Sequence, residues 1–455
     1  MPLHRVAGAR CIFALLALAA IALASTGCGP RSRDLQPGSY RAVLELPGGE
    51  LPFGLDVARE ESGLVLYLVN GTERVRVHEV TVEPGRLTAK MPGFENTLEA
   101  RVSGDELEGE LTLLRRGGET QVLPFKAKLG ATWRFFEEPL TDNADVAGRW
   151  SVTFTDGEGK KTPAVAELAQ SFGTVTGTIL TPTGDHRFLA GEVRGDDLRL
   201  SCFDGAHAYL YHAKVGEQGN LVGEFWSGKA GHERFVARRD PDAVLDTSAV
   251  DTGIKDRGVR LEFAFPDLNG QTVSLADARF QGRPVIVVLA GSWCPNCHDE
   301  AAFLAPLYAK YRDQGLEVVS LMFEHFGDFE RAAAATRRFR TEFGIEYVTL
   351  IAGISDKTEA AKVLPQLTGV FAFPTTIFLD RTGRVRKIHA GFSGPATGSH
   401  YEQLTHEFTS LVETLLAEPA GAPAGDAGRM TPAAGATTED ATTVAPAEAA
   451  LPVAP

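Results

Sequence analysis

Two cysteines separated by two residues, Cys294 and Cys297 in the segment SWCPNCHD, have the types and spacing that could do chemistry. Such a pair can bind a metal, close a structural disulfide or pass electrons by thiol–disulfide exchange. A metal site would need further ligands at zinc-like spacing, and only His298 is nearby, so we expect no metal. A structural disulfide would close a very small loop and stabilise the fold little. We therefore predict a redox pair.

The flanking residues indicate where the pair lies in the fold. The run PVIVVLA (284–290) is continuously apolar, which is typical of a strand covered on both faces, and a helix-like stretch follows from Pro295. At the N-terminus of that helix, unsatisfied backbone N–H groups and the helix dipole favour a thiolate at Cys294. We predict that Cys294 attacks and that Cys297, one turn on and less exposed, resolves the mixed disulfide.

The elements after the pair continue to alternate between strand and helix patterns. We expect strands at 316–322 and 375–380, and helices at 328–343 and from about 401 to 417. This alternation predicts an α/β domain over 261–417, a sheet with helices on both faces.

The N-terminal half has a different pattern, short alternating apolar stretches broken by Gly, Asn and Asp, which predicts an all-β region. It contains an internal duplication, because GSY at 38–40 recurs as GRW at 148–150, and LEGEL at 107–111 as LVGEF at 221–225. We predict two tandem β-units, 38–138 and 147–239. Cys202 aligns with Met91, so we expect a buried small hydrophobic residue there and no third redox thiol.

The remaining segments carry signals of export and of flexibility. Basic residues, an apolar stretch and small residues predict a signal peptide over 1–27. The segment STGC resembles a lipobox, with Cys28 as the lipidated residue, although Ser25 stands where Leu is usual and plain secretion stays open. We expect linkers at 28–37 and 240–260, and a disordered tail at 418–455 that is rich in Ala, Pro, Thr and Gly.

The charge of the chain limits its partners. There are 59 acidic and 45 basic side chains, a formal net charge of -14, which disfavours nucleic acid and anionic membrane surfaces as electrostatic partners. We predict a cell-envelope protein on the periplasmic face, held at the membrane through a lipid anchor at Cys28.

Two separated motifs resemble the TlpA/ResA-like branch of extracytoplasmic thioredoxin-fold proteins. They are FAFPDLNGQTVSLADARFQGRPVIVVLAGSWCPNCHDE and, later, GVFAFPTTIFLDRTGRV, and the resemblance covers 261–417. It implies a redox-active Cys294–Cys297 disulfide with no other cofactor, preceded by the aromatic Trp293. It also implies a cis bond between Phe373 and Pro374, beside which substrate docks as an added strand.

The resemblance also bears on proton transfer. Glu300 matches the acidic residue of this branch and could shuttle the proton of Cys297, or it could be a solvated residue of the first helical turn. Val288 stands at the position of thioredoxin's buried Asp, which leaves Glu300 or water as the proton carrier. His298 could raise the thiolate content if protonated, or could face solvent.

These observations predict an extracytoplasmic thiol–disulfide oxidoreductase that reduces protein disulfides and is recharged by a membrane electron donor. Reduction of apocytochrome c cysteines is one role of the family that the chain resembles. The alternatives are a thiol peroxidase on the same fold, although LAGSWC lacks the usual Thr and Pro cradle, and a non-catalytic envelope protein that acts through its β-units.

Overall fold

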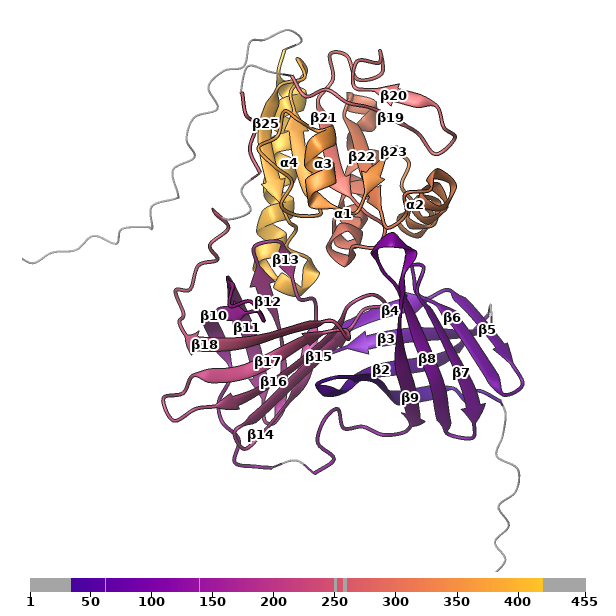
Figure 1. Cartoon of the computed structure of the whole chain (residues 1–455), viewed down its shortest axis with the longest axis vertical. Helices are drawn as coiled ribbons and strands as arrows, with labels where there is room; N and C mark the ends of the chain where they lie inside the picture. The colour runs from indigo at the N-terminus through magenta and orange to yellow at the C-terminus, as the bar shows by residue number, and fades with distance from the viewer. Residues whose placement is uncertain (1–33, 62, 139, 249–251, 257–259, 420–455) are drawn as a thin grey trace, which may run out of the picture. The chain divides into compact units, whose positions relative to one another are not determined.

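The structure is a computed structural model that describes residues 34–61, 63–138, 140–248, 252–256 and 260–419, all within one compact unit (Figure 1). The predicted signal peptide, Cys28 and the tail from residue 420 onward lie outside the described residues. In the described ranges no helix is both long enough and apolar enough to cross a membrane.

The first β-unit is a single antiparallel sheet of nine strands in the order β4-β3-β2-β1-β9-β8-β7-β6-β5. Its strands alternate buried and exposed side chains, as their sequence pattern predicts, and the buried faces enclose one core. The strands are β1 (Gly38–Leu46), β2 (Gly49–Glu60), β3 (Gly63–Asn70), β4 (Glu73–Val77), β5 (Glu79–Glu83), β6 (Arg86–Lys90), β7 (Thr97–Ser103), β8 (Glu106–Leu114) and β9 (Thr120–Leu129).

The second β-unit is also a sheet of nine strands, in the order β11-β10-β18-β17-β16-β15-β14-β12-β13, and an extra pairing of β11 with β12 closes it on itself. Its core is built around the buried Trp150. The strands are β10 (Gly148–Thr155), β11 (Lys161–Ser171), β12 (Thr174–Thr181), β13 (Gly184–Asp185), β14 (Leu189–Arg194), β15 (Asp197–Phe203), β16 (Ala208–Val215), β17 (Leu221–Ser227) and β18 (Gly231–Arg239).

The strand orders of the two sheets support the proposed duplication. If β1 to β9 are matched in order with β10 to β18, every pair of neighbouring strands in the first sheet has a counterpart in the second. For example, β1 pairs with β2 and β9, and β10 pairs with β11 and β18. The second sheet differs by the additional pairing of β12 with β14, which completes the closed ring. Cys202 and Met91 are both buried, so Cys202 occupies an apolar core position as predicted.

The C-terminal part is a sheet of five strands in the order β23-β22-β21-β24-β25, with β21 at its centre. Strand β21 runs parallel to β22 and antiparallel to β24. The strands are β21 (Val285–Ala290), β22 (Glu317–Glu324), β23 (Val348–Ile354), β24 (Thr375–Leu379) and β25 (Val385–Ala390), and a small hairpin, β19 (Ala264–Pro266) and β20 (Thr272–Ser274), precedes them. The helices are α1 (Pro295–Tyr311), α2 (Phe329–Phe343), α3 (Lys357–Val363) and α4 (Ser399–Ala417).

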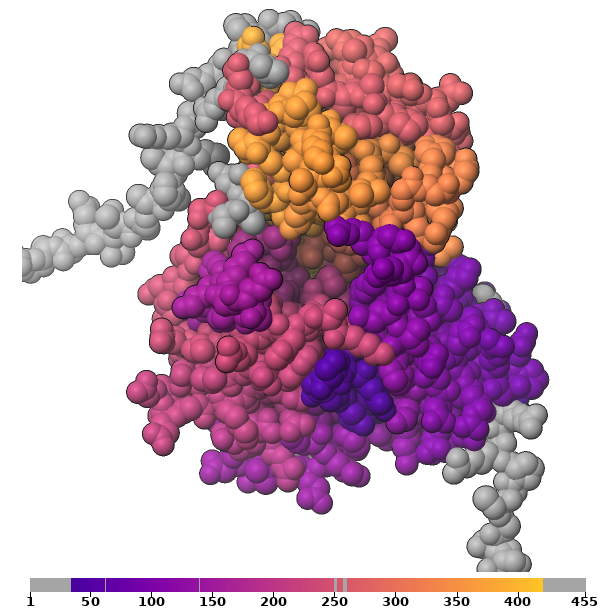
Figure 2. Space-filling view, viewed as in Figure 1, coloured from indigo at the N-terminus to yellow at the C-terminus, as the bar shows by residue number. Residues whose placement is uncertain are grey.

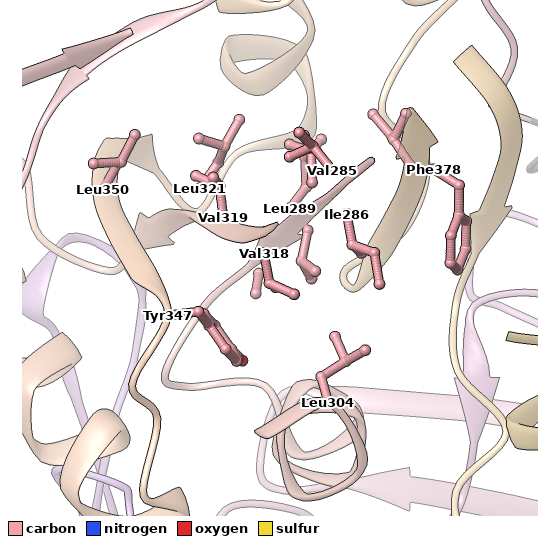
Figure 3. Close-up of a cluster of buried hydrophobic side chains, with 14 of the residues drawn as sticks. Val285, Ile286, Leu289, Leu304, Val318, Val319, Leu321, Tyr347, Leu350 and Phe378 are labelled. Atoms are coloured by element: carbon pink, nitrogen blue, oxygen red, sulfur yellow. The ribbon is translucent and has the colours of Figure 1, made fainter. Parts of the chain in front are cut away.

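The core of this part forms around β21, whose residues are all buried, as its unbroken apolar run predicts. Figure 3 shows Val285, Ile286 and Leu289 of this strand beside Leu304 of α1 and Phe378 of β24. The predicted class, an all-β N-terminal region followed by an α/β thioredoxin fold, is confirmed. This core fixes the end of β21 and the start of α1, between which the cysteine pair lies.

Candidate active site

The cysteine pair lies where β21 passes into α1, with Cys294 as the N-cap residue of the helix. The backbone N–H of Cys297 donates a hydrogen bond to Cys294 Sγ over 3.3 Å, so the sulfur occupies the position where a helix N-terminus stabilises negative charge. Pro295 fits the first helical position, which needs no N–H donor. Both cysteines are free thiols, and Cys294 is 5% and Cys297 1% exposed.

The structure brings the other predicted docking residues next to Cys294. The peptide bond between Phe373 and Pro374 is cis, the geometry that the resemblance implies, and the Cys294 thiol donates to Phe373 O over 3.4 Å. The indole N–H of Trp293 donates to Phe323 O over 2.8 Å, and its ring meets Phe373 edge-on with 5.8 Å between ring centroids. Phe373 therefore contacts the sulfur of Cys294 directly, while Trp293 packs on Phe373 and Pro374 follows it through the cis bond.

The two thiols differ in their surroundings. Burial raises the pKa of the Cys297 thiol well above its ordinary value, and the neighbouring Cys294 and Glu300 raise it further. Cys297 is thus held as a thiol until a base takes its proton, whereas the sulfur of Cys294 accepts a backbone hydrogen bond. The two thiols therefore differ in burial and in hydrogen bonding, and their roles in the reaction stay a prediction.

Glu300 is buried, 1% exposed, so the alternative of a solvated residue in the first turn is wrong. The Thr376 hydroxyl donates a hydrogen bond to its carboxylate. Burial raises the pKa of Glu300 to about 8, and the hydrogen bond from Thr376 opposes that shift. A carboxyl group with this pKa can exchange a proton near neutral pH.

His298 fits neither of the roles that its sequence position suggested. It is buried, its Nε2–H donates to Ser292 O over 2.7 Å, and its ring stacks on Phe94 of the first β-unit at 4.0 Å between centroids. Burial lowers the pKa of His298 to about 3, so the ring is neutral and cannot stabilise a thiolate by charge. The reason is the packing of the β-unit over a helix face that looks exposed in the sequence.

Glu324 is a site residue that sequence reasoning missed. Its carboxylate accepts hydrogen bonds from Ser292 N at 3.0 Å, Ser292 Oγ at 2.7 Å and Thr336 Oγ1 at 3.2 Å. Burial raises the pKa of Glu324 to about 7. It fixes the loop that leads into Cys294, and the signal that could have found it is a carboxylate directly after the apolar run Leu321–Met322–Phe323 at the end of β22.

The second group that the sequence did not indicate comes from the second β-unit. Asn296, between the two cysteines, donates from Nδ2 to Asp185 Oδ2 over 3.2 Å. Arg187 pairs with Asp299, two residues after Cys297. These contacts join residues more than a hundred positions apart, and no motif in either segment announces them.

Part of the chain is similar to known proteins. Residues 255–404 match the Redoxin family. The thiol–disulfide oxidoreductase ResA of Halalkalibacterium halodurans is 25% identical over 153 residues, 34% of this chain and 74% of the relative. ResA of Bacillus subtilis is 24% identical over 33% of this chain and 72% of its own length. ResA of Bacillus thuringiensis is 28% identical over 27% of this chain and 62% of its own length.

Solved structures also match about a third of the chain. One is a putative thiol:disulfide interchange protein DsbE from Chlorobium tepidum, with 23% identity, 33% of this chain and 96% of that chain covered, and a TM-score of 0.26. Another is a DsbF homologue from Corynebacterium diphtheriae, with 22% identity, 37% and 97% covered, and a TM-score of 0.28. The matches to Redoxin and ResA show that this chain contains a part similar to the thioredoxin-like thiol–disulfide oxidoreductases of the TlpA/ResA type.

Proposed function

We propose that this protein is an extracytoplasmic thiol–disulfide oxidoreductase that reduces disulfides of protein substrates through Cys294 and Cys297. The observation that carries the proposal is the position of Cys294 Sγ, between the N–H of Cys297 and the carbonyl of Phe373, at the start of α1 and beside Pro374. The redox group is the cysteine pair, and we propose no further cofactor.

The reaction proceeds in two exchanges. The Cys294 thiolate attacks a substrate disulfide, forms a mixed disulfide and releases one substrate thiolate. Cys297 then loses its proton and attacks Cys294 Sγ, which releases the second substrate thiol and leaves the Cys294–Cys297 disulfide. Two electrons pass from the dithiol to the substrate, so a dithiol donor must reduce the pair again before the next cycle.

Glu300 is our proposed acceptor for the proton of Cys297. It follows Cys297 by three residues on α1, and its charge raises the pKa of that thiol, so the two groups interact. Its own pKa, about 8, lets it take up a proton near neutral pH and return it in the reverse step. No charged residue takes the place of thioredoxin's buried Asp, since Val288 is an apolar core residue of β21.

The direction, partners and location of the reaction are further parts of the proposal. We propose that the chain is exported, is anchored by lipid at Cys28, faces the periplasm and receives electrons from a membrane donor. A dithiol that works outside the cytoplasm needs such a supply, because disulfides persist there. Apocytochrome c thiols are one candidate substrate, supported by the family resemblance alone.

Reduction of insulin by dithiothreitol tests the proposal. Catalytic amounts of the chain are expected to accelerate precipitation of the insulin B chain, and Cys294→Ser is expected to remove the acceleration. Cys202→Ser is the matched control, because Cys202 is a free thiol in the core of the second β-unit and lies outside the C-x-x-C motif. Acceleration that survives Cys294→Ser would refute the proposed function.

A further inference from the structure

One buried arginine joins the two β-units to the thioredoxin-fold part. Arg187 Nη2 lies 2.9 Å from Glu73 Oε1 of β4, and Arg187 Nε lies 3.3 Å from Asp204 Oδ2, which follows β15. Its remaining nitrogen, Nη1, pairs with Asp299 of α1. We call these four residues the Arg187 cluster. Because Arg187 and Asp204 are buried and the side chains of Glu73 and Asp299 are only 8% and 12% exposed, the guanidinium is needed to offset the carboxylates around it.

Next to this cluster the second β-unit touches the cysteine motif itself. Asp185 accepts hydrogen bonds from Asn296 Nδ2 and, over 2.7 Å, from the backbone N–H of Gly394. Gly184 lies so close that a Cβ there would approach Asn296 Nδ2 to 2.7 Å, and its φ of +149° also favours glycine. The close fit requires a residue without a side chain at position 184.

The first β-unit contacts the same end of the thioredoxin-fold part. Phe94 stacks on His298, the residue after Cys297. The short 3-10 helix η1 (Arg116–Gly118) donates from Gly117 N to His325 O over 2.9 Å, and Arg116 pairs with Asp356 at 2.6 Å. Figure 2 shows this purple segment lying against the orange segments of the C-terminal part.

These contacts leave little of the attacking thiol accessible. Cys294 is 5% exposed in the whole chain, and Asn296, on the outer side of the pair, is buried too. Tyr209 of β16 lies near the dithiol, because the charge of Cys294 adds to the effect of burial in raising the pKa of its phenol. A protein disulfide needs open backbone beside Pro374 and a free path to Cys294 Sγ, whereas Phe373 is only 7% and Cys294 only 5% exposed.

We propose that the two β-units form a cap over the redox centre, and that breaking the Arg187–Asp299 pair opens the cap to protein substrates. The inference rests on the proposed function and adds that the cap controls the access of protein substrates to Cys294. Small thiols and disulfides reach Cys294 in the closed form more easily than folded proteins do. A cavity of about 390 Å³, lined by Trp293 together with Arg115 and His207, lies beside the residue that precedes Cys294.

The test compares alkylation of reduced Cys294 by N-ethylmaleimide and by the same maleimide on a polyethylene glycol chain. The ratio of the two rates, read at the Cys294 peptide by mass spectrometry, cancels changes in thiol reactivity and reports access. The deciding variant is Asp299→Asn in the full chain, because Arg187 keeps its pairs with Glu73 and Asp204. Arg187→Met is the second variant, and Arg238→Ala, exposed on β18, is the matched control.

We expect the bulky-to-small ratio to rise about tenfold or more in Asp299→Asn and to stay at the wild-type value in Arg238→Ala, since loss of one partner of a buried pair shifts equilibria by at least this factor. Insulin reduction should rise with it, while reduction of oxidised glutathione stays unchanged. If the folded Asp299→Asn variant has the same bulky-to-small alkylation ratio as wild type, the proposed cap is refuted. Failure of the wild-type chain to reduce oxidised glutathione would instead refute the proposed function, so the two failures are distinguishable.

Discussion

At the scale of residues, the fold treats two chemically identical thiols differently. Cys294 caps a helix and accepts a backbone N–H, whereas Cys297 is enclosed in the core with a raised pKa. The difference arises from position along one helical turn: the first thiol faces the free N–H groups and the second faces the sheet. This difference supports the proposed order, in which Cys294 attacks and Cys297 resolves.

Replacing the resolving thiol is expected to stop the reaction halfway. Cys297→Ser keeps the attack by Cys294 but leaves no thiol to release the mixed disulfide, so a covalent complex with a disulfide substrate should accumulate. Non-reducing electrophoresis after mixing with an insulin-type substrate measures it. The complex should disappear in the double variant with Cys294→Ser, and its persistence there would contradict the assigned order.

Glu300→Gln is expected to slow release of the mixed disulfide by about a hundredfold, because a positioned proton acceptor contributes at least this much. Stopped-flow measurement with a chromogenic disulfide reports the step.

The same substitution should change the pH dependence of stability. In the folded protein the pKa of Glu300 is about 8, above its ordinary value of 4.5. The bound proton therefore stabilises the fold fully below pH 4.5, and this stabilisation is lost as the pH rises from 4.5 through 8.

Wild type should therefore lose stability relative to Glu300→Gln as the pH rises through this window, by about 1.4 kcal/mol for each unit of the pKa difference at most. Urea unfolding at several pH values gives the difference. Glu402→Gln, exposed in α4, is the control and should run parallel to wild type. A parallel course for Glu300→Gln would mean that this carboxyl group titrates normally.

At the scale of elements, α2 supports the site without contributing to its chemistry. It delivers Thr336 to Glu324 and Phe339 to the ring of His298. Its start is fixed by Asp328, whose carboxylate accepts the backbone N–H of Arg331 over 2.9 Å. The loop before Cys294 thus depends on a helix that begins at a defined residue.

Asp328→Ala is expected to lower the free energy of unfolding by about 1 kcal/mol, because an N-cap hydrogen bond is lost. Chemical denaturation followed by circular dichroism measures the change. Asp328→Asn retains an acceptor at the cap and should recover most of the stability. Equal losses in both variants would show that charge, and not the cap hydrogen bond, is what matters at this position.

The elements around the pair were predictable because local signals specify them. The apolar run of β21, the start of α1 at Pro295 and the second motif around Pro374 each carry their own pattern, and the structure places them together. The burial of Glu300 and of His298 was not predictable in the same way. Both depend on residues that pack against α1 from elsewhere in the chain. Thr376 of β24 contacts Glu300, and Phe94 of the first β-unit contacts His298. The helical periodicity of α1 gives no information about either partner.

At the scale of the whole molecule, the sequence indicates a β-region followed by a redox domain, with only a linker between them. In the structure, side-chain contacts also connect the two. Asp185, Arg187 and Glu73 look like ordinary surface residues of polar strands and turns. They are buried because three distant segments meet at one place. Hydrophobic patterning within a strand cannot report such an arrangement, because the partners are chosen by tertiary packing.

This joining predicts that the parts unfold together. Alkylation of Cys297 and loss of the β-sheet signal in circular dichroism should have the same midpoint in urea for wild type, because the contacts couple the parts. In Asp299→Asn the two transitions should separate. Separate midpoints already in wild type would show that the β-units and the redox domain are energetically independent.

The most direct test of the central claim is the reduction potential of the Cys294–Cys297 couple in the chain from Pro30 onward, equilibrated in dithiothreitol or glutathione buffers. A reduction potential near that of thioredoxin, about -270 mV, is the result expected for a reductase that needs an electron supply. A couple near the strong oxidants, about -120 mV, would contradict the reducing direction. A chain that forms no disulfide between these cysteines would contradict the redox function itself.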